Sequence, residues 1–162
     1  MNESETRAEL VDPKLRESGW GEVDGSRIRR EFHITDGRIQ VGGTRGKRDI
    51  ADYILVYNNQ KVAVVEAKSD REEASEGVAQ AKEYAEKLHI DFTYATNGRE
   101  IYEISMNTGK EGIVKAFPTP EQLWKRIYPN DNDWRERFAA VPFENIFGEA
   151  GMRFYPDFCQ LV

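Results

Sequence analysis

The chain has 162 residues, a length that suits one domain with a single hydrophobic core. Hydrophobic residues make up 39% of it and aromatic residues 11%, which indicates a folded globule, and no apolar run approaches the length that crosses a membrane. The formal net charge of −6 argues against a protein that grips nucleic acid by itself, because such proteins usually carry a surplus of basic residues.

The N-terminal region predicts a helix followed by a β-hairpin. Asp12 before Pro13 is typical of a helix start, with the aspartate as N-cap and the proline at the first helical position. Gly19 is a typical helix stop. The predicted elements, in order, are a helix to about Ser18, a strand at 29–34, a turn at Asp36-Gly37, a return strand at 38–41 and a glycine-rich loop at 42–46.

Two further strands joined by a tight turn are predicted at residues 49–57 and 61–68. Both are rich in Val, Ile and Tyr, and the polar residues 58–60 separate them. Asp52, Glu66 and Lys68 interrupt these apolar strands. Unpaired buried charge is costly, so charged residues at these positions call for a specific reason.

The chain after this hairpin predicts a crossover. A helix at 74–88 has a buried stripe at helical spacing, and it lies between the hairpin and a further strand. A strand, a helix and a strand in this order suggest parallel pairing, which gives an α/β fold with a mixed β-sheet flanked by helices. The remaining predicted elements are strands at 92–96 and 100–105 around an Asn97-Gly98 turn, an edge strand at 113–117, and a helix from Thr119-Pro120 to about Ile127.

The register of the central hairpin follows from the length of its loop. If residues 58–60 form a three-residue loop, Tyr57 pairs with Lys61, and counting back places Asp52 opposite Glu66. Cross-strand partners have Cβ atoms about 4.5–5.5 Å apart. A loop one residue shorter or longer would break this register.

The same parity argument predicts a metal site. Glu66 and Lys68 share one face of their strand, while Ala67 points to the other and Asp49 has the wrong parity to join them. Two carboxylates as close as Asp52 and Glu66 favour a divalent cation with oxygen ligands, most simply Mg²⁺ or Mn²⁺.

Several other residues are candidates with two interpretations each. Gln80 and Tyr84 are four residues apart, so they share one face of the predicted helix. They are either site residues or ordinary polar residues of a half-exposed surface. Glu31 lies in a predicted strand, near the site or simply on the surface. Basic residues cluster at 27–30 and again at 45–48. The second cluster ends at Arg48, shortly before Asp52 in the chain. It either steers phosphates to the metal or is an ordinary charged loop.

The order Asp52, Glu66-Ala67-Lys68 across a hairpin resembles the PD-(D/E)xK nuclease signature, although Ala51 stands where the signature has proline. Roughly from residue 5 to 128, the chain also resembles the N-terminal nuclease domain of the restriction subunit of type I restriction-modification enzymes. The phrases that carry this second resemblance are Leu15-Arg-Glu-Ser-Gly-Trp20, Lys47-Arg-Asp-Ile-Ala-Asp-Tyr53, Val64-Val-Glu-Ala-Lys68, Gln80-Ala-Lys-Glu-Tyr84 and Ala95-Thr-Asn-Gly98.

This resemblance implies a restriction-endonuclease-like fold and a metal-dependent endonuclease acting on double-stranded DNA. It implies a nuclease domain at 1–128 and an irregular extension at 129–162, leading towards a helicase-type motor absent from this chain. Methyltransferase and specificity subunits would be partners through the full-length protein, and ATP would be used only in the motor. Asp52, Glu66 and the Ala67 carbonyl would hold the metal, Lys68 would act on the attacking water, Gln80 and Tyr84 would pack near the site, and Glu31 would approach the metal.

Cysteine and histidine content limits other sites. Cys159 is the single cysteine, which excludes an intramolecular disulfide and favours a reducing cytoplasm. His33 and His89 lie too far apart to give a zinc-site spacing, and the acidic, polar residues 1–5 show no signal-peptide pattern. Two other functions remain open: a non-catalytic DNA-binding or docking module of the same fold, and a free-standing exonuclease of the same superfamily.

Overall fold

The computed structural model describes residues 1–35 and 49–129. The chain divides into two units, Met1–Ile127 and Tyr128–Val162, and the fold below is that of the first. Five predicted features lie outside the described residues: the Asp36-Gly37 turn, the return strand at 38–41, the glycine-rich loop at 42–46, the basic cluster ending at Arg48, and nearly all of the extension at 129–162.

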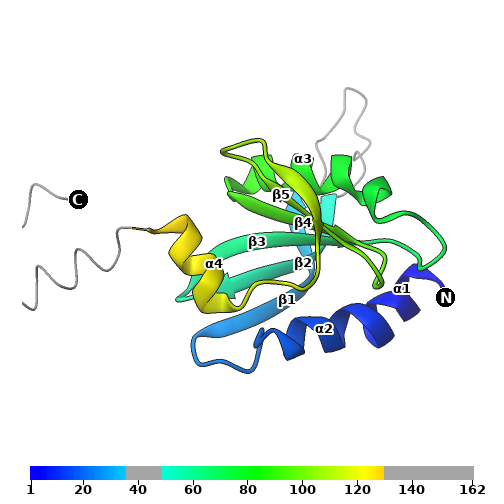
Figure 1. Cartoon of the computed structure of the whole chain (residues 1–162), viewed down its shortest axis with the longest axis horizontal. Helices are drawn as coiled ribbons and strands as arrows, with labels where there is room; N and C mark the ends of the chain where they lie inside the picture. The colour runs from blue at the N-terminus through cyan, green and yellow to red at the C-terminus, as the bar shows by residue number, and fades with distance from the viewer. Residues whose placement is uncertain (36–48, 130–162) are drawn as a thin grey trace, which may run out of the picture. The chain divides into compact units, whose positions relative to one another are not determined.

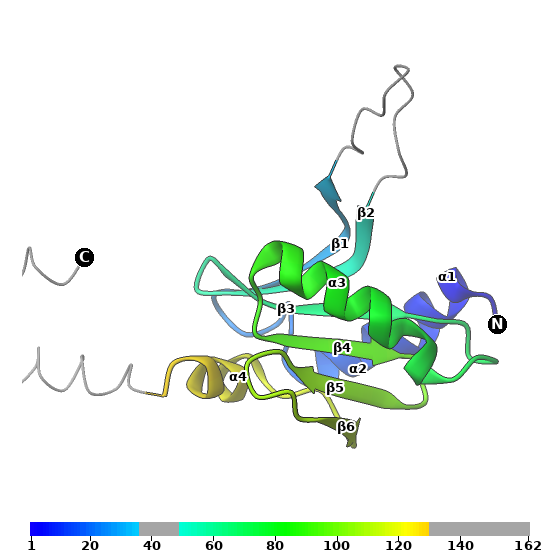
Figure 2. The same ribbon diagram turned by 90° about the horizontal axis from the view of Figure 1, so that it is seen from above.

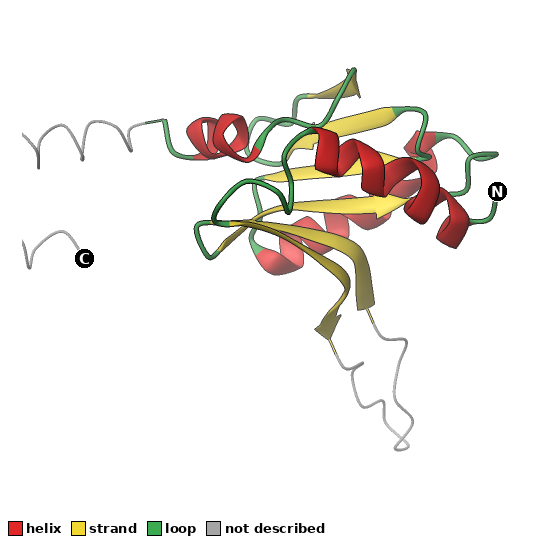
Figure 3. Cartoon of the chain, turned by 90° about the horizontal axis from the view of Figure 1, so that it is seen from below, coloured by secondary structure: helices red, strands yellow, loops and turns green. Residues whose placement is uncertain are grey.

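One mixed sheet of six strands forms the centre of the unit, and its strands follow one another in chain order. β3 and β4 pair in parallel, and every other neighbouring pair is antiparallel (Figures 1 and 3). The predicted α/β fold with a mixed sheet and a crossover is therefore confirmed. The strands are β1 Ser26–Thr35, β2 Asp49–Tyr57, β3 Gln60–Ala67, β4 Phe92–Thr96, β5 Ile101–Ser105 and β6 Glu111–Val114.

Helices cover both faces of this sheet. The crossover consists of a 3₁₀ turn, η2 (Ala74–Gly77), and helix α3 (Val78–Leu88), which lies across one face (Figure 2). Its Ala85 packs with Ile54 and Val64 in the core on that side. The opposite face is covered by the N-terminal helices and by α4 (Pro120–Ile127), and the core there includes Leu15, Trp20, Tyr53, Tyr94 and Leu123.

The edge strand lies earlier in the chain than predicted, because it runs from Glu111 to Val114 rather than from Ile113 to Phe117. A compact turn after Ser105 is closed by main-chain hydrogen bonds from Gly109 to Ser105 and from Ser105 to Lys110, so pairing with β5 resumes at once. Phe117, which was expected to end the strand, is instead buried against Tyr94.

The prediction that Asp12 caps the first helix is wrong. The helix begins after Asn2, whose side chain accepts from the main chain of Glu5 while the Glu5 side chain accepts from the main chain of Asn2. It continues without a break through α1 (Glu3–Thr6), a π-helical turn η1 (Arg7–Val11) and α2 (Asp12–Glu17).

Pro13 explains the π-helical turn. Proline has no main-chain N–H, and inside a helix its ring clashes with the carbonyl four residues earlier. The turn before it is widened, and the N–H of Asp12 bonds to the carbonyl of Arg7, five residues back. The Asp12 carboxylate, which caps nothing, instead accepts from the Tyr53 hydroxyl at 2.9 Å and from Arg30 at 2.6 Å.

The loop of the central hairpin is also shorter than predicted. Tyr57 pairs with Gln60, which leaves Asn58 and Asn59 as a two-residue loop. Both asparagines have positive φ, at 49° and 63°, as a type I′ turn requires.

A β-bulge compensates for this shorter loop. Val56 pairs with Lys61, but Leu55 pairs with Ala63, so Val62 is an extra residue on β3. Beyond the bulge Tyr53 pairs with Val65, and the next position along the two strands brings Asp52 level with Glu66. The register at the site is the predicted one, reached through a different turn.

Candidate functional site

Asp52 and Glu66 are held together by main-chain hydrogen bonds. The N–H of Asp52 donates to Oε1 of Glu66 at 3.2 Å, and the N–H of Ala67 donates to Oδ2 of Asp52 at 2.8 Å. Both residues are buried, with 9% of Asp52 and 1% of Glu66 exposed. The main chain of each strand thus holds the carboxylate that belongs to the other strand, so the two carboxylates form one rigid pair.

This pair carries unfavourable negative charge. Burial, and next the charge of Asp52, raise the pKa of Glu66 from 4.5 to about 8, against the opposing effects of the Asp52 N–H and of Lys68. Keeping both carboxylates ionised is therefore unfavourable near neutral pH, and a cation between them would relieve the repulsion.

Lys68 is oriented by a chain of hydrogen bonds from α3. Its Nζ donates to Oε1 of Gln80 at 3.0 Å, and Nε2 of Gln80 donates to the Tyr84 hydroxyl at 3.0 Å. The stem of Lys68 packs beside Gly77, where an added Cβ would make ordinary contact with Cγ and Cε of the lysine at 3.6 Å. The structure brings these three predicted site residues together through one connected set of contacts.

Asp49 does not belong to this cluster. Its Oδ2 lies 2.7 Å from Nζ of Lys87, a residue of α3, and forms an ion pair with it. Arg48 lies outside the described residues.

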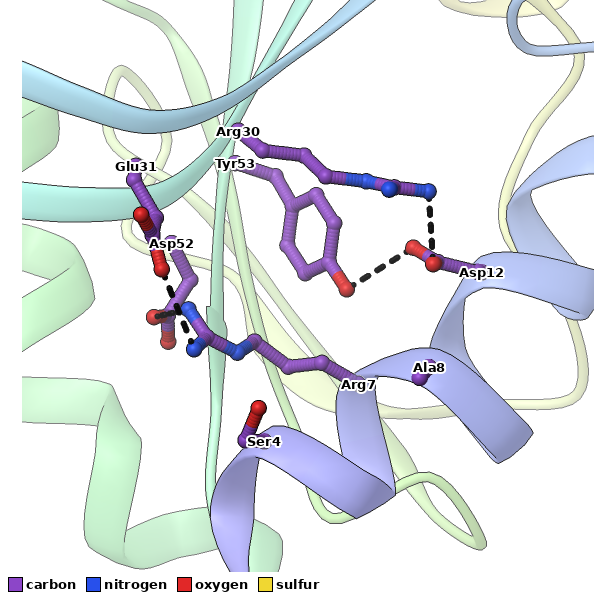
Figure 4. A pocket seen from close by; sticks show the side chains of 8 residues that line it. All are labelled: Ser4, Arg7, Ala8, Asp12, Arg30, Glu31, Asp52 and Tyr53. Carbon is purple, nitrogen blue, oxygen red and sulfur yellow. Dashed lines mark hydrogen bonds and ion pairs between the residues drawn. The ribbon is translucent and has the colours of Figure 1, made fainter.

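Arg7 is a site residue that the sequence reasoning missed. Its Nη1 donates to Oδ1 of Asp52 at 2.8 Å, and its Nη2 lies 3.4 Å from Oε1 of Glu31 (Figure 4). It belongs to the π-helical turn η1. Asn2 followed by Glu5 is the pattern of a capping box, and it could have revealed that a helix starts here and carries Arg7.

Glu31 lies at the level of Asp52 on the neighbouring strand, between the Arg30–Tyr53 and Phe32–Ala51 pairs. Its backbone has a φ of 48°, a left-handed conformation that is strained for a residue with a long side chain. Its carboxylate contacts Arg7, and 68% of its side chain is exposed. The structure therefore places it beside the carboxylate pair, linked through Arg7.

A pocket of about 300 Å³ opens beside Asp52, between the N-terminal helix and the sheet. Tyr53 and Arg30 both bond to Asp12 on its far wall, as Figure 4 shows. The lining residues are Ser4, Arg7, Ala8, Asp12, Arg30, Glu31, Asp52 and Tyr53.

The donor chemistry of the carboxylate pair fits an oxygen-seeking cation. Within residues 1–35 and 49–129, no group of three or more His, Cys, Asp or Glu side chains is arranged to hold a metal ion. Mg²⁺ is commonly bound through one or two carboxylates, with water and substrate phosphate completing its shell. Asp52 and Glu66 supply those two carboxylates, and such an ion would offset the burial and the Asp52 charge that raise the pKa of Glu66.

Comparisons with known proteins point to one family. Residues 39–91, which include Asp52, Glu66, Lys68, Gln80 and Tyr84, match a family model described as the second domain of the type I restriction enzyme EcoKI endonuclease subunit. The chain is 30% identical over 138 residues to the type I restriction enzyme EcoAI endonuclease subunit of Escherichia coli, covering 78% of this chain and 17% of that protein.

A solved structure agrees with the sequence matches. It is a fragment assigned to an HsdR subunit of a type I restriction enzyme from Vibrio vulnificus YJ016, with a TM-score of 0.75 and 43% sequence identity. The match covers 82% of this chain and 26% of the other. This chain therefore spans only a part of the proteins that it matches. In the part of the chain that the structure describes, no helix is long and apolar enough to cross a bilayer.

Proposed function

Because this chain belongs to the family of type I restriction enzyme endonuclease subunits, of which it spans a part, we propose that its domain is the nuclease of such a subunit. It hydrolyses phosphodiester bonds of double-stranded DNA with Mg²⁺ or Mn²⁺, on a fold of the PD-(D/E)xK type. The observation that carries the proposal is the interlocked pair of Asp52 and Glu66, with Lys68 directly after the end of β3.

Asp52 and Glu66 are the side chains that hold the metal in this proposal, with the main-chain carbonyl of Ala67 as a further ligand. The bound metal neutralises phosphate charge and lowers the pKa of a water molecule. Glu66 would hold the cation as a carboxylate, because the positive charge would offset the burial and the Asp52 charge that raise its pKa.

Lys68 orients the attacking water and stabilises the negative charge that develops on the phosphate. One of its three N–H groups is engaged by Gln80, so the ammonium group has a fixed direction while its other protons remain for substrate. Tyr84 in turn fixes the amide of Gln80. These two residues of α3 are positioning residues that act through Lys68.

The rest of the enzyme supplies what this chain lacks. The net charge of −6 gives little attraction for DNA, so DNA has to be delivered by other parts of the assembly. We expect the full-length subunit to use ATP in a motor outside this chain and to work with methyltransferase and specificity subunits.

A non-catalytic DNA-binding or docking module is the alternative. It is favoured by Arg7, which already neutralises Asp52 without a metal. The two functions differ in whether the carboxylate pair takes up a divalent cation.

Calorimetric titration of the chain with Mn²⁺ tests the proposal. Asp52→Asn preserves the size of the side chain and one acceptor oxygen but removes its charge, so it should abolish binding. Asp49→Asn is the matched control, since Asp49 pairs with Lys87 instead, and it should bind as the wild type does. If the wild type takes up no metal, or if Asp52→Asn binds equally well, the nuclease proposal is refuted. The same substitutions in the full-length subunit should give the same ranking in plasmid cleavage.

A further inference from the structure

The guanidinium of Arg7 occupies the side of Asp52 that faces the pocket. Its Nη1 donates to Oδ1 of Asp52 at 2.8 Å, while Oδ2 of the same carboxylate is bonded to the main chain of Ala67. Of the two oxygens, Oδ1 is thus the one that faces the pocket and is held only by a side chain. A metal that binds Asp52 from the pocket has to take this oxygen.

The helix that carries Arg7 is firmly seated, so this contact is a built feature of the fold. The neighbouring Thr6 is buried, and its hydroxyl accepts from the main chain of Asp70, just after β3. Leu10 packs so closely on the turn between β4 and β5 that a Cβ at Gly98 would lie 2.5 Å from Cβ of Leu10. The backbone at Arg7 is therefore fixed, and only its side chain can change place.

Arg7 and a divalent ion compete for Asp52. Mg²⁺ binds carboxylate oxygens at about 2.0–2.1 Å, and it repels a guanidinium that remains within hydrogen-bonding distance of the same oxygen. Metal binding has to release the Arg7 side chain from Asp52.

The pocket of about 300 Å³ beside Asp52 gives the released guanidinium room to move. Besides Arg7 and Asp52, it is lined by the small residues Ser4 and Ala8 and by Asp12, Arg30, Glu31 and Tyr53. A phosphate that reaches a metal on Asp52 enters next to this pocket. Arginine binds phosphate through two parallel N–H donors, which makes it suited to hold a phosphodiester there.

We propose that Arg7 is a phosphate-positioning residue, which the metal-free site keeps on Asp52 and which metal binding exchanges onto the DNA backbone. This inference rests on the proposed function, because it needs a metal at Asp52. It assigns to the N-terminal helix a direct part in substrate binding, and it predicts effects of opposite sign on metal and on DNA.

The first measurement is Mn²⁺ affinity by calorimetry. Arg7→Met removes the competing cation and should tighten binding about ten- to hundredfold, the range that charged hydrogen bonds support. Arg7→Gln, the second variant, should tighten it in the same direction. Arg30→Met is the matched control: it removes the same charge from the same pocket, but its partner is Asp12, and it should change the affinity by less than about threefold.

The second measurement is the affinity for a short DNA duplex by fluorescence anisotropy, at low salt and with Ca²⁺ in place of Mg²⁺ to prevent cleavage. Arg7→Met should weaken binding about three- to tenfold although it binds metal more tightly. Arg27→Met is the control, because Arg27 bonds to Asn59 at the far end of the hairpin, and it should lose less than Arg7→Met does.

The outcomes separate the two proposals. If Asp52→Asn loses Mn²⁺ binding while both Arg7 variants bind it as the wild type does, the exchange is refuted and the nuclease proposal stands. If the Arg7 variants gain metal affinity without any loss of DNA affinity, the phosphate role is refuted. If the wild type takes up no metal, the proposed function fails, and this inference fails with it.

Discussion

The main-chain N–H of Asp52 donates a hydrogen bond to Oε1 of Glu66, across the two central strands. This bond places two carboxylates side by side in a buried corner, where burial and, second, the charge of Asp52 raise the pKa of Glu66. The negative charge of this pair can thus be neutralised by a proton, by the guanidinium of Arg7 or, in our proposal, by a divalent cation.

Glu66 should make the stability of the metal-free protein depend on pH. Its pKa is about 8 in the folded chain and 4.5 ordinarily, so the folded state binds the proton more tightly. The stabilisation is complete below about pH 4.5 and is lost as the pH rises towards 8. Glu66→Gln mimics the protonated form and should be more stable than the wild type at pH 8 by about 1–3 kcal/mol.

Urea unfolding at pH 5, 6.5 and 8 in the presence of a chelator measures this difference. Glu86→Gln, an exposed change on α3, serves as the control and should follow the wild type. A constant difference between wild type and Glu66→Gln across this range would contradict the explanation.

Lys68→Ala should separate metal binding from catalysis. A protonated lysine has no lone pair for a metal, so the substitution should leave Mn²⁺ affinity nearly intact. Cleavage by the full-length subunit should fall about 10²–10⁴-fold, the usual contribution of a positioned acid–base group. Lys82→Ala is the control, since Lys82 on α3 pairs with Glu111. Loss of metal as complete as in Asp52→Asn would refute the role of Lys68.

Gly98→Ala should loosen the N-terminal helix. Gly98 has a φ of 82°, and the added Cβ would lie 2.5 Å from Leu10, so both backbone strain and a clash oppose the change. Gly109→Ala meets only the first penalty, because its φ is 69° but nothing lies within 4 Å of the new Cβ. We expect about 1 kcal/mol of destabilisation at Gly109 and clearly more at Gly98.

Thermal unfolding of the two variants, with protease sensitivity of the N-terminal helix as a second readout, checks the comparison. Equal destabilisation would show that the contact with Leu10 contributes nothing.

The chain alone should cut DNA poorly even with its site intact. Its net charge of −6 opposes binding to a polyanion, and the nuclease proposal assigns DNA delivery to other parts of the subunit. Plasmid nicking at physiological salt with Mg²⁺ should stay near background and rise when the salt is lowered. Robust cleavage by the isolated chain at physiological salt would contradict this expectation.

The sequence by itself was sufficient to predict the central strands and the crossover through α3. These features depend on short periods and on local turn chemistry, which neighbouring residues set. The neighbouring positions of Gln80 and Tyr84 were within reach for the same reason, because residues four apart on a helix share one face.

Only the tertiary structure decided how Asp52 reaches Glu66. The two asparagines form a turn one residue shorter than expected, which alone would have shifted every pair and placed the wrong face of β3 against Asp52. The bulge at Val62 restores the register, because both faces of β2 and β3 are buried and cannot exchange their apolar side chains. The contact of Arg7 with Asp52 lay equally beyond the sequence, because it joins residues 45 positions apart through the seating of a helix on the sheet.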